Sequence, residues 1–254
     1  MNKFLFFFGL IFALAYSQLV LAQQSRFDRA NELLSQNNIE DAVDIYKELK
    51  SEGYSSGSLW FNMGISYVQM DSLGKAKFYF LRAGEFQNTE DVATEALNFI
   101  EDRLSRRSAV LPRLPWERFF DWLSYVFGKQ FLLIGGLLLL NGAAGLVITG
   151  WFVDKGKIWF KRSSLAIAVA GLFSILSSAY LDYTDDRYLT GVMVENQTVM
   201  YQAPDTESAV ITTVYEGYQM TVDAYESREQ EGWNYVRLQN GMFGWIDSDL
   251  IMTF

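Results

Sequence analysis

The sequence lacks two of the residue types that most often carry out catalysis or bind metals. Its 254 residues include no cysteine and no histidine. Cysteine nucleophiles, histidine general bases, Ser-His-Asp triads and zinc sites built from His or Cys are therefore excluded. Disulfide bonds are excluded for the same reason, so packing alone must hold the folded parts together.

Acidic residues between Asp223 and Glu231 are the side chains that come nearest to a general-acid or metal site. They have no partner base, and a solvated surface loop explains them better than chemistry does. The sequence also contains no glycine-rich phosphate loop and no nucleophile–base pair. We therefore expect no enzymatic activity, no cofactor and no bound metal.

The charge of the chain is acidic and unevenly distributed. The formal net charge is −9, and the segment from Asp182 to Phe254 carries 13 acidic residues against 3 basic ones. Nucleic-acid binding requires a basic surface that displaces counterions from phosphates, so this balance argues against it. The acidic C-terminal part also gains nothing from anionic lipid head groups.

Residues 1–22 have the pattern of a secretory signal peptide. A lysine at position 3 precedes an apolar stretch from Phe4 to Tyr16, and small residues lie near Ala22, after which we expect cleavage. No cysteine follows, which excludes a lipoprotein anchor. An uncleaved membrane anchor is the alternative, and both interpretations place the next segment outside the cytoplasm.

Residues 23–107 are predicted to form one helical-repeat domain, in which the sequence from Arg26 to about Phe86 repeats itself at a period of 34 residues. A helix break lies at Asn37-Asn38 in the first copy and at Asp71-Ser72 in the second. The matched positions are Phe27/Phe61, Ala30/Gly64, Leu33/Tyr67, Ala42/Ala76, Tyr46/Phe80 and Leu49/Ala83. This pattern resembles the tetratricopeptide (TPR) repeat of paired helices. An ordinary helical bundle with a chance period is the alternative. The segment from Glu90 to Arg107 is expected to be a capping helix.

The TPR resemblance implies a concave groove lined by the first helix of each pair, where a peptide or a partner's helix docks. On this register the candidate partner-binding residues are Phe27, Asn31, Phe61, Ile65 and Gln69. Packing within the helices is the alternative role for the two phenylalanines and the isoleucine.

The middle of the chain is predicted to enter a membrane twice. Residues 108–128 are assigned to a linker and an aromatic interfacial helix, for which a soluble amphipathic helix is the alternative. Residues 129–153 and 164–181 are long and apolar enough to span. The loop 154–163 carries four basic residues, and three aspartates follow the second span. The positive-inside rule therefore places the loop in the cytoplasm.

Small residues are expected to let the two spans pack on each other, although a partner's membrane helix could use the same faces. In the first span these residues are Gly135, Gly142, Gly145 and Thr149, with Asn141 nearby, and in the second they are Ala166, Ala170, Ser174 and Ser178. Neither span contains an ionisable residue from 131 to 153 or from 164 to 181, which argues against a transport pathway.

Residues 188–254 have the composition of an all-β domain with short strands separated by turns, including Asn240-Gly241. The stretch 232–246, with Gly-Trp, Val-Arg, Asn-Gly and Gly-Trp-Ile, resembles the end of a bacterial SH3 domain. The chain departs from that family at residues 200–204, where an Arg-x-Gly-Pro type of turn is common. Tyr201 and Tyr225 are candidate surface aromatics, whereas Trp233 and Trp245 are expected in the core.

These predictions describe a multidomain membrane protein with an all-α TPR-like repeat, a transmembrane helical hairpin and an all-β SH3-like barrel. The order of its parts is similar to that of BatE-type proteins of the Bacteroides aerotolerance operon. The resemblance implies an inner-membrane scaffold, facing the periplasm or exterior, that binds envelope proteins of the von Willebrand A-domain type in oxidative-stress tolerance. Peptidoglycan binding by the SH3-like domain is the alternative function, and enzymatic activity is the third hypothesis.

Overall fold

The computed structural model describes residues 21–106, 108–153 and 156–254. Most of the predicted signal peptide, residues 1–20, lies outside the described residues. The described chain divides into two units. One contains the N-terminal helices up to Ala109 together with most of the C-terminal sheet, and the other contains residues 110–189 and 223–228.

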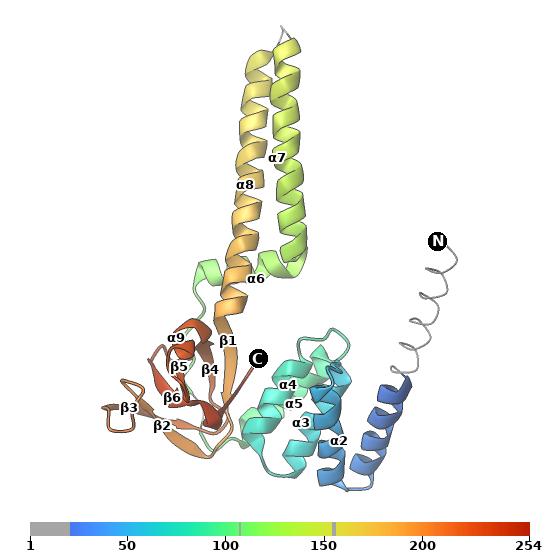
Figure 1. The fold of residues 1–254 in the computed structure, drawn as a ribbon, viewed down its shortest axis with the longest axis vertical. Helices are drawn as coiled ribbons and strands as arrows, with labels where there is room; N and C mark the ends of the chain where they lie inside the picture. The colour runs from blue at the N-terminus through green and yellow to red at the C-terminus, as the bar shows by residue number, and fades with distance from the viewer. Residues whose placement is uncertain (1–20, 107, 154–155) are drawn as a thin grey trace, which may run out of the picture. The chain divides into compact units, whose positions relative to one another are not determined.

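The N-terminal part is helical throughout (Figure 1). Residues 21–35 are helical, and they are followed by α2 (Ile39–Ser51), α3 (Gly57–Gln69), α4 (Leu73–Ala83) and α5 (Glu90–Arg103). Ser56 caps α3, because its hydroxyl accepts a hydrogen bond from the backbone N–H of Leu59. The predicted capping helix at 90–107 corresponds to α5, which ends four residues earlier than expected.

The local structure of the first two helix pairs recurs at the 34-residue spacing of the sequence. Asn37 and Asp71 both adopt positive φ angles, 63° and 56°, at the predicted helix breaks. The backbone N–H of the next residue bonds to the carbonyl of Leu33 in the first copy and of Tyr67 in the second, 2.9 Å in both. The small residue of each first helix, Ala30 or Gly64, is buried. The same local sequence signals therefore produce the same helix–turn–helix geometry twice.

Close approach of α3 and α4 depends on the absence of a side chain at Gly64. A Cβ added there would lie 2.5 Å from the ring of Phe80, which is itself buried. The neighbouring Tyr79 of α4 stacks on both Trp60 and Tyr67 of α3, with ring centroids 6.0 Å and 5.3 Å apart. Aromatic rings thus fill the space between the two helices.

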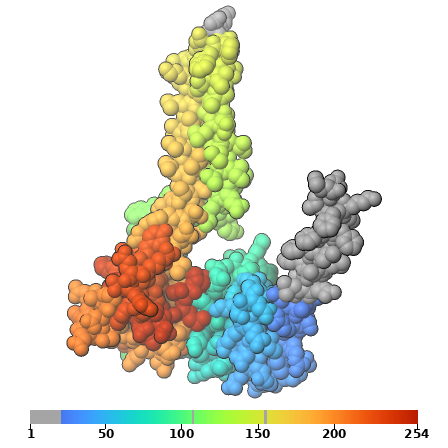
Figure 2. Space-filling view, viewed as in Figure 1, coloured from blue at the N-terminus to red at the C-terminus, as the bar shows by residue number. Residues whose placement is uncertain are grey.

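The second unit contains α6 (Pro115–Phe127) and two long apolar helices, α7 (Lys129–Phe152) and α8 (Lys157–Arg187). Both α7 and α8 are long and apolar enough to cross a membrane. They lie side by side along their length in the ribbon and in the space-filling view (Figures 1 and 2). The second helix extends beyond the predicted span 164–181 at both ends, and β1 follows it directly.

Packing between α7 and α8 uses only part of the predicted small-residue faces. A Cβ added to Gly136 would lie 2.8 Å from the carbonyl oxygen of Gly171, whereas nothing lies within 4 Å of Gly142 or Gly145. The serine prediction fits better, since Ser174 Oγ donates to the carbonyl oxygen of Leu132 at 2.6 Å. The prediction for the α7 glycines was wrong because the helix turns Gly136, one residue beyond Gly135, toward its neighbour.

The C-terminal part folds into a sheet of seven strands whose described pairings are antiparallel. The strands are β1 (Tyr188–Met193), β2 (Gln197–Tyr201), β3 (Val210–Tyr215), β4 (Gln219–Asp223), β5 (Trp233–Leu238), β6 (Phe243–Asp247) and β7 (Ile251–Thr253). Two short helices, α9 (Ala224–Arg228) and η1 (Ser248–Leu250), interrupt them.

The strand order is β3-β2-β6-β5-β4-β1-β7, so β3 and β7 are the edges. The predicted barrel is therefore corrected to an open sheet that curls without closing. The turn that connects edge strand β3 to β4 contains Gly217 at φ 78°, a value that favours glycine.

The helices and the sheet share one hydrophobic cluster within the first unit. Val192 of β1 is fully buried in the same cluster as the core residues of the helical part, and Met252 and Phe254 pack against it. The ring of Phe254 meets that of Phe78 of α4 edge-on, with centroids 5.3 Å apart. The helical part and the SH3-like part, predicted as separate domains, are thus packed on each other.

Candidate functional site

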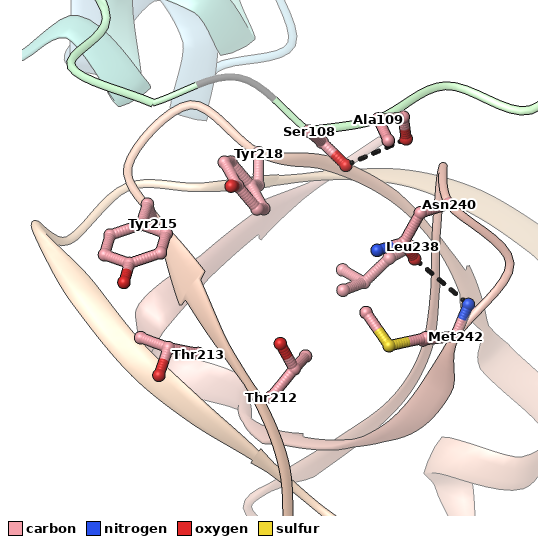
Figure 3. Close-up of a pocket in the computed structure, with 9 residues that line it drawn as sticks. All are labelled: Ser108, Ala109, Thr212, Thr213, Tyr215, Tyr218, Leu238, Asn240 and Met242. Carbon is pink, nitrogen blue, oxygen red and sulfur yellow. Dashed lines mark hydrogen bonds between the residues drawn. The ribbon is translucent and has the colours of Figure 1, made fainter.

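A cavity of about 270 Å³ lies beside edge strand β3, within the first unit. Figure 3 shows the residues around it. They are Ser108, Ala109, Thr212, Thr213, Tyr215, Tyr218, Leu238, Asn240 and Met242.

Two tight turns position most of these side chains. In the turn between β3 and β4, the backbone N–H of Tyr218 bonds to the carbonyl of Tyr215 at 3.0 Å, and the two rings meet edge-on. In the predicted turn between β5 and β6, the N–H of Gly241 bonds to the carbonyl of Leu238 at 2.9 Å. The side chain of Asn240 accepts a bond from the N–H of Met242 in the same turn. Local hydrogen bonds thus fix both sides of the cavity.

The lining combines neutral polar groups with a small apolar surface. Two threonines and two tyrosines supply hydroxyl groups, Asn240 supplies an amide, and Leu238 and Met242 supply apolar contacts. None of the nine lining side chains is charged. Such a site can bind a neutral polar ligand through hydrogen bonds and a few apolar contacts.

The segment that follows α5 contributes one wall of the cavity and is anchored against the β3–β4 turn. A Cβ at Gly217 would overlap the buried side chain of Leu104. The ammonium of the buried Lys77, on α4, donates to the carbonyl oxygen of Gly217 at 2.7 Å and forms an ion pair with Glu101 of α5. Ser108 and Ala109 follow this anchor and reach the cavity.

A second set of aromatic side chains lies along one face of the sheet. Tyr201 pairs with Trp245 across β2 and β6, and Trp245 pairs with Tyr235 across β6 and β5. The ring of Tyr201 also meets that of Trp233 edge-on at 5.7 Å. Trp233 and Trp245 are half-buried on this row, so the prediction that places them in the core is only partly met.

The second predicted surface aromatic, Tyr225, lies on α9 in the other unit and is 41% exposed. Its ring meets that of Tyr183 of α8 edge-on at 6.1 Å. Asp223, at the start of the acidic stretch, is buried and bonds to Arg187 at 2.7–2.8 Å. This carboxylate also accepts hydrogen bonds from two backbone N–H groups of α9, so the expectation of a fully solvated loop was wrong at this residue.

The five residues predicted to line the repeat groove have different environments. Phe27 is buried against Tyr46 and Tyr54. Phe61 and Ile65 are half-buried against the helical core, and Phe61 contacts Phe80.

The two polar members of the predicted groove also differ. Asn31 is half-buried, and its side-chain oxygen accepts hydrogen bonds from the Tyr46 hydroxyl and the Asn62 amide. Gln69 is exposed at the end of α3. Four of the five side chains therefore pack in the helical part or belong to a hydrogen-bond network, and Gln69 is the exposed member of the set.

The β-strand geometry around the cavity agrees with a comparison to known families. Residues 197–252 match the family model of the Bacterial SH3 domain. The match includes the lining residues of the sheet and the aromatic row, and it excludes the helices α2 to α8 and the segment 104–109. No curated protein matches the chain.

Sequence reasoning found the SH3 domain and its Asn240-Gly241 turn but missed the cavity. Thr212, Thr213, Tyr215 and Tyr218 have the residue types of any strand and turn, so their pattern carries no functional signal by itself. Within the described residues, the structure also contains no group of three acidic side chains that could hold a metal ion.

Proposed function

We propose that the chain is a non-enzymatic, membrane-anchored binding protein of the bacterial cell envelope, whose SH3 domain binds cell-wall material through the cavity. The observation that carries this proposal is a neutral, hydroxyl-lined cavity of about 270 Å³ in a segment that matches the Bacterial SH3 domain. Cell-wall glycopeptides present many hydroxyl and amide groups, which suit such a lining.

The membrane arrangement supports an outward-facing position. Four basic residues in the loop 154–163 and three aspartates after the second span favour a cytoplasmic loop by the positive-inside rule. The two folded parts then share the opposite side of the membrane, where bacterial SH3 domains are typically found. The signal peptide predicted at residues 1–22 agrees with this topology.

Co-sedimentation with purified sacculi tests the proposal with the full-length protein in detergent micelles. Thr212→Phe fills the cavity with a residue that suits a strand, and we expect it to weaken binding about tenfold. Thr221→Phe is the matched control, because Thr221 is an exposed residue of β4 outside the cavity. Wild-type protein that stays in the supernatant, or equal loss of binding in both variants, would overturn the proposal.

A second candidate function is that of an adaptor whose TPR-like repeats bind another envelope protein, as BatE-type proteins would in an aerotolerance complex. The recurrence of the same turn geometry at Asn37 and Asp71 favours it, since tandem helix pairs commonly serve as docking surfaces. A photo-crosslinker placed at Gln69 in cells tests it. Capture of membrane proteins with von Willebrand A-like domains supports the adaptor, and capture of unrelated proteins alone argues against it.

A further inference from the structure

Arg106 lies beside the cavity although it belongs to the segment that follows the helices. Its guanidinium carbon is 4.7 Å from the centre of the ring of Tyr215, a residue of the cavity wall. A cation over an aromatic face is attracted by the quadrupole of the ring, which holds the side chain near this position. Two residues further along, Ser108 and Ala109 line the cavity itself.

The charge of Arg106 is not neutralised by a carboxylate among the described residues. Three other cations of the first unit do have such partners: Arg26 pairs with Glu52, Lys77 with Glu101 and Arg82 with Glu85. Arg106 is exposed and its described contact is with the tyrosine ring alone. A guanidinium that has no carboxylate partner keeps its five N–H donors available for a ligand.

The acidic residue nearest to the Arg106–Tyr215 contact in the sequence is engaged elsewhere. Glu216 follows Tyr215 directly, but its carboxylate accepts a hydrogen bond of 2.7 Å from the backbone N–H of Gly74, near the start of α4. Elsewhere the SH3 segment is strongly acidic, with 10 acidic residues against 2 basic ones between Tyr188 and Phe254. Arg106 therefore supplies positive charge at a place where the surrounding domain would repel an anion.

We propose that Arg106 and the cavity form one composite site for a peptide that carries a free carboxylate. The cavity accepts the neutral peptide groups, and the guanidinium binds the carboxylate through two parallel hydrogen bonds. This inference rests on the proposed cell-wall function and names the peptide, rather than the glycan, as the recognised part. The helical part supplies the cation, so residues 197–252 alone lack part of the site.

Titration of the full-length protein in detergent micelles with two probes tests the composite site. One probe is a synthetic stem pentapeptide with free carboxylates, and the other is the same peptide with those carboxylates converted to amides. We expect the wild-type protein to bind the free acid about tenfold more tightly. High salt is expected to reduce this preference, because the contact lies near the surface.

Three variants separate the charge of Arg106 from its effect on folding. Arg106→Gln should abolish the preference for the free acid, and Arg106→Lys should restore part of it, since lysine keeps the charge without the planar fork. Arg103→Gln is the matched control: it removes a charge from the end of α5, where Arg103 stacks on Phe99 away from the lining residues. It should retain the wild-type preference.

The outcomes distinguish failure of this inference from failure of the proposed function. If the wild-type protein sediments with sacculi but binds both peptides equally, or if Arg106→Gln keeps the preference, the composite site is refuted while cell-wall binding stands. If the wild-type protein binds neither sacculi nor peptide, both proposals fail. Loss of the preference in Arg103→Gln as well would show a general charge effect and would also overturn the assignment to Arg106.

Discussion

Tyr46 is fully buried between the first two helix pairs, and its hydroxyl donates a hydrogen bond of 2.7 Å to the side-chain oxygen of Asn31. Burial raises the pKa of Tyr46 to about 12, because a phenolate would lose its hydration there. Burial also raises the pKa of Tyr67 and of Tyr79 in the same helical core. The helical part therefore depends on tyrosines that must stay protonated.

These shifts predict a loss of stability at alkaline pH. The unfolded chain releases the Tyr46 proton near pH 10, whereas the folded chain keeps it to about pH 12. The stabilisation is therefore complete below pH 10 and falls as pH rises between these values. In urea unfolding from pH 9 to 11.5, Tyr46→Phe should reduce this decline by up to about 1.4 kcal/mol per pH unit. Equal slopes for the variant and the wild type would contradict the prediction.

Lys77 illustrates a buried charge that joins distant parts of the chain. Its side chain is 7% exposed, and it connects Glu101 of α5 with the backbone carbonyl of Gly217 in the β3–β4 turn. Lys77→Met keeps most of the volume but leaves that carbonyl without its donor. We expect the free energy of unfolding to fall by about 1–3 kcal/mol.

The matched control for this variant is Lys47→Met on α2, where the lysine is exposed and pairs with Asp44 in the same helix. Exposed pairs of this kind contribute about 0.5 kcal/mol or less, so the control should unfold almost as the wild type does. Both proteins are compared by urea unfolding at neutral pH. A loss no larger for Lys77→Met than for Lys47→Met would show that the buried contact contributes nothing to stability.

At the scale of elements, the turns could be predicted from the sequence better than the packing faces. Asn37 and Asp71 mark helix breaks because asparagine and aspartate tolerate positive φ, and this preference is local. The face that α7 turns toward α8 depends on the rotation of the helix about its own axis. Small residues recur at every third or fourth position of α7, so the sequence does not determine this rotation. The same limitation applies to Phe27, whose position in the repeat fits both a groove and a core.

The glycines of α7 allow a direct test of its packing. Gly136→Leu would place its side chain against the backbone of α8, since even a Cβ would lie 2.8 Å from the carbonyl oxygen of Gly171. We expect a loss of about 1–3 kcal/mol from overpacking, seen as a lower melting temperature of the protein in detergent. Gly142→Leu, which faces open space on the same helix, should change it little. Equal effects would contradict the packing of α7 on α8.

At the scale of the whole molecule, the contact between the helices and the SH3 domain could not have been predicted. Lys77 and Gly217 are far apart in the sequence, and neither residue type signals the other. Leu104 follows a helix that the sequence describes only as a cap, yet its side chain is buried against Gly217. Local sequence patterns identify helices and strands, whereas a contact between two domains depends on the shapes of their folded surfaces.

This contact predicts that the helical part and the SH3 domain resist opening together. Leu104→Ser removes a buried apolar group at their junction, and we expect a loss of about 2–4 kcal/mol. Hydrogen exchange measured by mass spectrometry should then accelerate both in α5 and in the β3–β4 turn, while exchange in α7 and α8 stays unchanged. Phe99→Ser is the matched control, because Phe99 lies on α5 just before Leu104 and has 52% of its surface exposed. Faster exchange confined to α5 would mean that the two parts open independently. In that case the contact of Leu104 with Gly217 would not stabilise the wall that Ser108 and Ala109 contribute to the cavity.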